Sequence, residues 1–187
     1  MIERFFDLIV SSVLLALTIL PMVIVAFLIK IDSKGGIIHK SKRIGKYNKI
    51  FIMYKFRTMK VSTPDLATHK LKKPDLYLTK FGKILRKYSI DELPQIFNVL
   101  LGSMSLVGPR PALYNQFDLI KMRNKKKIHF LTPGITGWAQ INGRDKISIK
   151  QKVKLDEIYK NKKNIFFDIY IICLTIVKIF KKKDIIH

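Results

Sequence analysis

The sequence predicts a small α/β domain, mostly helical with short strands, joined to an apolar N-terminal membrane segment. Residues 8–29 contain no charged side chain, and about 20 apolar residues suffice to cross a bilayer. Residues 50–54 are apolar and aromatic in the manner of a short strand. Apolar residues then recur at helical spacing in residues 81–88 and 93–100, which indicates helices with one buried face.

The N-terminal segment is too long for the core of a signal peptide, and no small-residue cleavage site follows it. Pro21 falls near its middle, where a proline removes a helix hydrogen bond and favours a kink. Basic residues are more numerous after the segment than before it, which favours a cytoplasmic main domain. Two shapes fit: a straight spanning helix, which hydropathy alone favours, or a helix–break–helix hairpin that enters and leaves by one membrane face.

The charge of the chain is strongly positive. Its 187 residues, enough for one domain and an appendage, include 36 Lys+Arg against 13 Asp+Glu, a net charge of +23. Such a surface attracts polyanions: nucleic acid, anionic lipid headgroups or phosphorylated substrates. Cys173 is the single cysteine, which permits a reducing compartment because it excludes an intramolecular disulfide. The four histidines are far apart and show no metal-ligand spacing.

The strand expected at residues 50–54 runs into two basic residues. Because side chains alternate along a strand, Lys55 and Arg57 are expected on one face and Tyr54 and Phe56 on the other. Two cations on one side of a strand suit a phosphate or diphosphate. The alternative is a solvated basic face, which is the more common arrangement.

Two further segments are candidates for helices at the membrane surface. Residues 63–78 contain two prolines and are expected to form a surface loop. In the helix that follows, an apolar stripe lies beside four basic residues, as in helices that lie on a membrane: Lys80, Lys83, Arg86 and Lys87. Residues 164–180 are apolar but include Asp168 and Lys178, so we expect a helix in the interface or against the domain. The lysines after it suit an anionic leaflet.

Asp91 and Glu92 form an acidic pair within this basic chain. Ser89 and Glu92 have the spacing of a helix capping box, while Pro94 favours a slightly later start with Asp91 as the N-cap. In either register the two carboxylates lie at the positive end of the helix dipole, which also attracts phosphates. The pair is therefore either a helix cap or a reactive site.

Arg110 lies between Pro109 and Pro111. The two prolines restrict the backbone, so the guanidinium is held within a narrow range of positions. A guanidinium held in this way suits bidentate binding of phosphate or carboxylate. The alternative is a rigid turn whose arginine points to water. We favour a functional Arg110, because a rigid turn does not need an arginine.

Residues 132–144 combine three glycines, one proline and the only tryptophan. Glycine permits close approach of the backbone to a ligand, and Trp138 has a ring that can stack on a base. Trp138, Gln140 and Arg144 are the candidates here for contacts with a nucleotide or sugar. A loop that packs one tryptophan into the core has an equal claim.

Taken together, these residues resemble the bacterial sugar transferase family, the small monotopic phosphoglycosyl transferases. The resemblance covers nearly the whole chain and depends on four motifs in family order and spacing: YKFRTM at 54–59, SIDELPQIFNVL at 89–100, SLVGPRP at 105–111 and PGITGWAQINGR at 133–144. Together the four motifs are far more specific than any one of them.

The resemblance implies a reaction and a site. Members transfer a phosphosugar from a UDP-sugar to undecaprenyl phosphate or a related polyprenol phosphate at the cytoplasmic face, release UMP and need Mg²⁺. The family's acidic dyad matches Asp91 and Glu92, with the aspartate as covalent nucleophile. Because Mg²⁺ is typically bound by one or two carboxylates together with substrate phosphate oxygens, Glu92 and Asp91 are also the candidate metal ligands. Its Pro-Arg-Pro arginine matches Arg110, and an aspartate of its last helix matches Asp168. Its membrane segment is a re-entrant hairpin broken at a proline, which matches Pro21.

Two positions depart from the family pattern. Leu101 and Ser103 stand where the family often has a basic residue and an aspartate, and residues 40–43 lack the glutamine that usually precedes the first basic pair. Neither departure touches the acidic dyad. They bear on sugar choice or on membrane contact.

The resulting hypothesis divides the chain into a re-entrant membrane hairpin, residues 1–30, and a cytoplasmic catalytic domain, residues 31–187, with interfacial helices at about 79–101 and 164–180. It places a sugar-1-phosphate transferase in the bacterial inner membrane, with anionic lipids and downstream glycosyltransferases as partners and no nucleic acid. Two alternatives are a membrane-tethered nucleic-acid-binding protein that uses the basic charge, and a catalytically silent scaffold.

Overall fold

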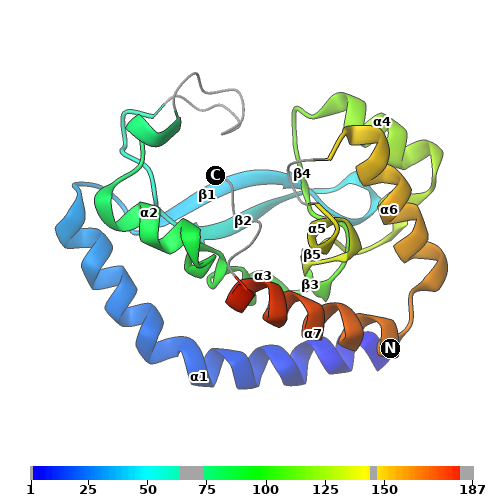
Figure 1. Ribbon diagram of the computed structural model, residues 1–187, viewed down its shortest axis with the longest axis horizontal. Coiled ribbons are helices and arrows are strands. Elements are labelled where there is room, and N and C mark those ends of the chain that lie inside the picture. The colour runs from blue at the N-terminus through cyan, green and yellow to red at the C-terminus, as the bar shows by residue number, and fades with distance from the viewer. Residues whose placement is uncertain (1, 64–73, 144–146, 182–187) are drawn as a thin grey trace.

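The computed structural model describes residues 2–63, 74–143 and 147–181. The chain is mostly helical with a few short strands, as predicted, and opens with a long apolar helix (Figure 1). The α-helices are α1 (Ile2–Asp32), α2 (Lys80–Lys87), α3 (Gln95–Leu100), α4 (Phe117–Lys125), α5 (Trp138–Ile141), α6 (Ile149–Lys162) and α7 (Ile165–Lys181). The strands are β1 (Ile38–Ile44), β2 (Ile50–Phe56), β3 (Ser105–Val107), β4 (Ala112–Leu113) and β5 (Gly134–Thr136).

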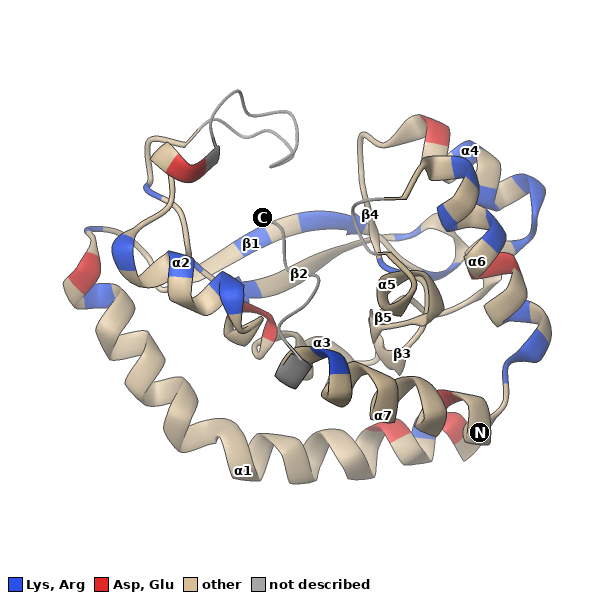
Figure 2. Cartoon of the chain, in the orientation of Figure 1, with Lys and Arg blue, Asp and Glu red and all other residues tan. Residues whose placement is uncertain are grey.

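Helix α1 is a single helix with Pro21 inside it. The expected break into two helices is therefore corrected: Figure 1 shows one helix that bends near the middle of its length. A proline inside a helix removes one backbone hydrogen bond, which permits a bend without ending the helix. By length and composition alone, α1 could cross a membrane, and Figure 2 shows its charged residues only at its two ends.

Both halves of α1 contact the rest of the chain. Near its start, the Arg4 guanidinium donates hydrogen bonds to the carbonyls of Val99 and Leu100, the latter at 2.8 Å. One turn later, the Asp7 carboxylate accepts a hydrogen bond from the Leu106 N–H at 3.0 Å. The second half packs into an apolar cluster with residues of β2 and α2: Met22, Val25, Ile29, Phe56 and Leu85.

The strands form two small sheets. Strand β1 pairs antiparallel with both β2 and β4, so the strand order is β2–β1–β4, and β3 pairs parallel with β5. In the β1–β2 register, His39 is opposite Lys55 and Lys40 is opposite Tyr54. Residues directly opposite one another share a face of the sheet. Lys55 and His39 therefore lie on one face of this strand pair, and Tyr54 and Lys40 lie on the other.

The predicted elements are largely found, with different boundaries. The strand expected at 50–54 is the start of β2, and the helix expected at 164–180 is α7. The helical region expected at about 79–101 consists of α2, a 3-10 turn at Ile90–Glu92 named η4, and α3. Most of the loop expected at 63–78 lies outside the described residues.

The main core cluster joins the sheets to the helices. Its buried members come from β2, α3, β3, α5, α6 and α7 and from the turn before β3: Met53, Val99, Met104, Leu106, Val107, Ile141, Tyr159 and Ile171. Met53, next but one to Lys55 along β2, is 3% exposed. The core therefore fixes β2 and α3 in place on either side of the acidic pair, so that the side chains between them are held in one geometry.

Candidate active site

The acidic pair lies in η4, the 3-10 turn between α2 and α3. Ser89 has a φ of 56° and forms no side-chain cap, so the capping box predicted for Ser89 and Glu92 is absent. A non-glycine residue in the left-handed region is uncommon and marks a sharp turn. Helix α3 begins later, at Gln95, so Asp91 is not its N-cap either. Neither carboxylate caps a helix, and both extend toward Lys55 of β2.

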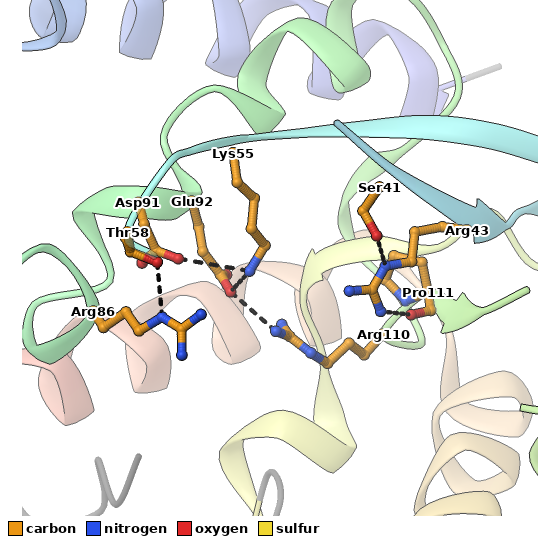
Figure 3. A network of polar contacts seen from close by, with 9 residues as sticks. All are labelled: Ser41, Arg43, Lys55, Thr58, Arg86, Asp91, Glu92, Arg110 and Pro111. Carbon is orange, nitrogen blue, oxygen red and sulfur yellow. Dashed lines mark hydrogen bonds and ion pairs between the residues drawn. The ribbon is translucent and has the colours of Figure 1, made fainter. Parts of the chain in front are cut away.

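Lys55 and Arg110 hold the Glu92 carboxylate from two sides (Figure 3). The Lys55 ammonium lies 2.7 Å from Oε1 of Glu92 and 3.8 Å from Oδ2 of Asp91. Nη2 of Arg110 donates to the same Glu92 oxygen at 3.0 Å. Asp91 and Glu92 are 7% and 9% exposed. The structure thus brings together four predicted site residues from three separate segments of the chain.

Arg57 does not join this network. Its guanidinium donates to the carbonyls of Lys34 and, at 2.7 Å, Ser33, which satisfies acceptors after the C-terminal end of α1. The expectation that Lys55 and Arg57 share a phosphate-binding face is therefore corrected. Strand β2 ends at Phe56, and the alternation of side chains does not continue past the end of a strand. Arg57 secures the C-terminal end of α1 to the domain.

Arg86 is a site residue that the sequence analysis assigned to the membrane surface. It extends from α2 toward the acidic pair, and its Nε donates to Oγ1 of Thr58 at 2.9 Å (Figure 3). Its charge also acts on Asp91. No signal in the sequence separates Arg86 from the other basic residues of α2. With Lys55 and Arg110, three cations surround two carboxylates, so the ionised site keeps a net positive charge suited to an anionic diphosphate.

Burial dominates the electrostatics of the pair. It raises the pKa of Asp91 above its ordinary value; the positive charge of Lys55 opposes this rise, and the neighbouring Glu92 carboxylate adds to it. Burial also lowers the pKa of Lys55, and Glu92 opposes that fall. A buried charged form is disfavoured unless an opposite charge compensates it. The ionised states of Asp91 and Lys55 therefore depend on each other.

Two arginines support the backbone around Arg110. Arg123 donates to the Arg110 carbonyl at 2.8 Å and is itself paired with the buried carboxylate of Asp156, with Nη2 to Oδ2 at 2.6 Å. Arg43 of β1 donates to the Pro111 carbonyl at 3.3 Å (Figure 3). The sequence indicated that flanking prolines restrict Arg110. The structure adds hydrogen bonds from two distant segments that hold the same turn.

The glycines of residues 132–144 serve backbone packing. A Cβ placed on Gly134 would lie 2.0 Å from the amide nitrogen of Gly108, and one on Gly137 would lie 2.0 Å from the Gly108 carbonyl oxygen. The sequence predicted that a ligand approaches the backbone closely at these glycines. In the structure it is the backbone of Gly108, in the turn after β3, that lies close to Gly134 and Gly137. Because β3 leads directly into Pro109 and Arg110, these glycines help to place Arg110.

The three residues expected to contact a nucleotide or sugar have different surroundings. Trp138 packs against the ring of Phe167 in α7, with centroids 5.2 Å apart, which favours the structural alternative. Both polar atoms of the Gln140 side chain are buried and, within the described part of the chain, lack a hydrogen-bond partner. Arg144 lies outside the described residues.

Asp168 lies in α7, within a buried hydrogen-bond network. It accepts a hydrogen bond of 2.8 Å from the Tyr159 hydroxyl, which also donates to the Val107 carbonyl at 3.2 Å. Burial raises the Asp168 pKa to about 6, while the bond from Tyr159 opposes the rise. Asp168 in α7 is therefore linked, through the Tyr159 hydroxyl, to α6 and β3.

The described residues contain no group of three or more His, Cys, Asp or Glu side chains that could hold a metal ion. The two carboxylates of the acidic pair are adjacent, and Mg²⁺ is commonly bound by one or two carboxylates together with substrate phosphate oxygens and water. The pair therefore fits a Mg²⁺ ion whose coordination is completed by a diphosphate, rather than a closed protein site.

Comparison with known proteins finds relatives that are named as sugar transferases. The sugar transferase EpsL of Bacillus subtilis (strain 168), described as uncharacterized, is 40% identical over 185 residues, which cover 98% of this chain and 90% of EpsL. The UDP-glucose:undecaprenyl-phosphate glucose-1-phosphate transferases of Xanthomonas campestris pv. campestris and Escherichia coli (strain K12) are 39% and 36% identical. Those matches cover 87% and 98% of this chain but only 35% and 41% of the two relatives.

The family-level comparison covers almost every residue. The description "Bacterial sugar transferase" matches residues 1–182, a range that contains α1, the acidic pair, Lys55 and the turn at Arg110. The four sequence motifs all lie within it. The chain belongs to the bacterial sugar transferase family.

Proposed function

We propose that the protein transfers a sugar 1-phosphate from a UDP-sugar to undecaprenyl phosphate and releases UMP. The observation that carries the proposal is the buried pair Asp91 and Glu92, held by Lys55 and Arg110 in one network. Two of the relatives are named as enzymes that act on UDP-glucose and undecaprenyl phosphate. A family relation and a cation-rich carboxylate site together support phosphosugar transfer, the first membrane step of capsule, O-antigen, exopolysaccharide or glycoprotein glycan synthesis.

In the proposed first step, an Asp91 carboxylate oxygen attacks the phosphorus that carries the sugar. A bond from Asp91 to this phosphorus forms, the bond between the phosphorus and the bridging diphosphate oxygen breaks, and UMP leaves with that oxygen. In the second step, a phosphate oxygen of undecaprenyl phosphate attacks the same phosphorus. The Asp91 carboxylate is released and the lipid diphosphate-linked sugar forms. A soluble donor and a lipid acceptor can thus use one site in turn.

The cations of the site address the main obstacle, which is repulsion between an ionised aspartate and an anionic diphosphate. Lys55 favours the ionised form of Asp91, and Arg110 and Arg86 offer donors to phosphate oxygens. Glu92 pairs with both Lys55 and Arg110 and so holds these two cations beside the acidic pair. A Mg²⁺ ion held by Glu92 and Asp91 would neutralise charge on the diphosphate. The buried Gln140 amide, which has no hydrogen-bond partner among the described residues, and Arg144 are the candidates for contacts with the nucleotide or sugar.

The test is to incubate the purified full chain with a panel of UDP-sugars, Mg²⁺ and undecaprenyl phosphate, and to measure UMP. We expect UMP with at least one donor, a lipid-linked product of matching mass, and loss of both when EDTA removes Mg²⁺. Glu92→Gln should weaken transfer and raise the Mg²⁺ concentration for half-maximal rate. The absence of UMP across a broad panel would contradict the proposal.

The proposed membrane position is re-entrant, with the domain on the cytoplasmic side of the inner membrane. A straight helix of this length would extend for about 46 Å and place its ends on opposite sides of a bilayer. Both halves of α1 instead pack on the same domain, through Arg4 and Asp7 at one end and Val25 and Ile29 at the other. The basic excess after the segment favours the cytoplasmic face.

Labelling of a cysteine at residue 2 tests this topology, in a Cys173→Ser background and in sealed inner-membrane vesicles of both orientations. A re-entrant α1 predicts that a membrane-impermeant maleimide reacts only from the cytoplasmic side, as does a cysteine at Lys49. Reaction of residue 2 from the periplasmic side, with Lys49 still cytoplasmic, would show a spanning helix.

Further partners follow from the membrane position. Anionic inner-leaflet lipids suit the basic surface, and downstream glycosyltransferases would use the lipid-linked product. The comparisons give no support to a membrane-tethered nucleic-acid-binding protein. A silent scaffold is disfavoured by the intact acidic pair and by the paired cations around it.

A further inference from the structure

One face of the β1–β2 strand pair is apolar and exposed. The pairs Lys40–Tyr54, Lys42–Ile52 and Ile44–Ile50 lie directly opposite one another, and we name their side of the sheet, together with Ile38, the outer strand face. Side chains alternate along a strand, so this face is opposite to the one from which Lys55 reaches Glu92. Ile38, Ile50 and Ile52 are 40%, 61% and 37% exposed.

Exposed isoleucines on a sheet face need an explanation, because the solvated face of an antiparallel sheet normally carries polar residues. Here the apolar side chains alternate with Lys40 and Lys42, which are also exposed. Strands β1 and β2 and helix α3 contain no aspartate or glutamate. The face is thus both apolar and positively charged, the combination that suits an anionic lipid surface.

A groove lies beside this face. It has a volume of about 370 Å³ and is lined by Ile38, Lys40, Tyr54, Pro94, Phe97 and Leu101. Phe97 and Leu101 of the α3 segment are 38% and 73% exposed. Apolar side chains therefore stand on both sides of the groove, with one lysine at its wall.

The groove is separated from the acidic pair. The side chain of Asn98 in α3 accepts a hydrogen bond from the Tyr54 N–H at 3.0 Å and donates one to the Ile52 carbonyl at 2.7 Å. These two bonds join α3 to the edge of β2. The joined backbone lies between the groove and the face of the sheet from which Lys55 extends. The groove is consequently not a part of the site that holds the diphosphate.

The outer strand face is continuous with the packing surface of α1. Phe56, at the end of β2, packs with Met22 and Val25 of α1, and Arg4 binds the carbonyls of Val99 and Leu100 at the end of α3. Figure 3 shows Lys55 pointing away from the side of the strand pair on which the blue coils of α1 lie. The helix that is apolar enough for a membrane therefore contacts, through its two halves, the two elements that flank the groove, β2 and α3.

We propose that the outer strand face is a second membrane contact, in which the groove takes an acyl chain of an anionic phospholipid and Lys40 and Lys42 bind its phosphate. The proposal depends on the membrane position of α1 proposed above. The long lysine stems cover apolar surface while their ammonium groups reach the headgroups. This contact would hold the strand pair, and with it Lys55, at a fixed height above the bilayer.

The test uses single spin labels on the full chain in nanodiscs of phosphatidylglycerol and phosphatidylcholine, in a Cys173→Ser background. Labels replace Ile52 on the outer strand face, Leu17 on α1 and Phe117 on α4; these side chains are 37%, 70% and 73% exposed. Collision with oxygen reports lipid, and collision with a water-soluble nickel chelate reports solvent. We expect an oxygen-to-nickel ratio at residue 52 several-fold above that at residue 117.

The anionic headgroup is tested in two further arms. In nanodiscs of phosphatidylcholine alone, or in the double variant Lys40→Gln with Lys42→Gln, the ratio at residue 52 should fall toward that at residue 117, while residue 17 stays in lipid. If, in the anionic nanodiscs, the label at residue 52 is exposed to solvent while the label at residue 17 is in lipid, the proposed lipid contact of the outer strand face is overturned and the membrane position of α1 is not. Solvent exposure at both positions contradicts the membrane position of α1. Protection of residue 52 from both reagents would show a second copy of the chain on this face, and would also overturn the proposal.

Discussion

Asp91→Asn is expected to lower the rate of sugar-phosphate transfer by on the order of 10⁴-fold or more, because an amide cannot supply the attacking oxygen anion. The substitution preserves the size of a side chain that is only 7% exposed. Burial raises the pKa of the Asp91 carboxyl, which means that the buried site disfavours the charged form. The folded state should therefore tolerate a neutral amide at this position. The measurement is UMP release by the purified variant at saturating Mg²⁺ and donor.

Intact-mass spectrometry makes the same prediction specific to a covalent step. The unmodified chain, incubated with donor and Mg²⁺ but without lipid acceptor, should gain the mass of one phosphosugar, and peptide mapping should place it on Asp91. The Asp91→Asn variant should gain no mass. Asp75→Asn serves as the control, since Asp75 is an exposed aspartate in the 3-10 turn Pro74–Leu76. Full activity in Asp91→Asn would refute the assignment of the nucleophile.

Lys55→Met is expected to have the second largest effect, a loss of about 10²- to 10³-fold in transfer at neutral pH. Lys55 is the cation nearest to both carboxylates, at 2.7 Å from Glu92 and 3.8 Å from Asp91. Its charge lowers the Asp91 pKa against the effect of burial. Without it, that pKa rises further. A larger fraction of Asp91 is then protonated at any pH on the acidic side, and protonated Asp91 is a poor nucleophile.

The pH dependence of the rate tests this reason. The rate of the unmodified chain should fall on acidification as Asp91 takes up a proton, and fall at alkaline pH as Lys55, whose pKa burial lowers, loses one. In Lys55→Met the acidic limb should move to higher pH, and the alkaline limb that Lys55 causes should disappear. A lowered rate with an unmoved acidic limb would show that Lys55 does not act through the ionisation of Asp91.

Two controls separate this effect from loss of folding. Lys55→Arg keeps the charge and should retain more activity than Lys55→Met, with a smaller shift of the acidic limb. Lys49→Met removes an exposed lysine from the same sheet region and should leave the profile unchanged. Removal of one partner from a buried ion pair typically costs about 3–5 kcal/mol of stability, so circular dichroism of each variant should accompany the kinetics.

Much of this molecule follows from local patterns. The apolar run at residues 8–29 predicts a long apolar helix, because a charge-free stretch of that length has few other stable environments. Residues 50–54 predict a strand, and the spacing of Leu93, Ile96 and Phe97 predicts a helix. The buried face predicted with it is only partly found, because Ile96 is buried but Phe97 is 38% exposed. The acidic pair and the proline-flanked Arg110 were found because charged residues in these settings are chemically unusual.

Predictions failed where a side chain's partner lies far along the chain. Arg57 was placed beside Lys55 by strand alternation, yet it binds carbonyls after the end of α1. Ser89 has the spacing of a cap, yet its backbone turns left-handed. Arg86 matched its basic neighbours in α2, yet it points toward the acidic pair. Each of these conformations depends on which distant segment packs nearby. Local secondary-structure propensity carries no information about such tertiary contacts.

Residue types and short spacings therefore sufficed to predict the family, the long apolar helix and the acidic pair as the candidate site. The tertiary structure alone decided which cations meet those carboxylates and that α1 continues through Pro21 as one bent helix. It also decided which strand face remains bare. Burial and charge pairing act between segments that are distant in the sequence. The partners of each charged side chain in β2, η4 and the turn at Arg110 are therefore known only once these segments are seen packed together.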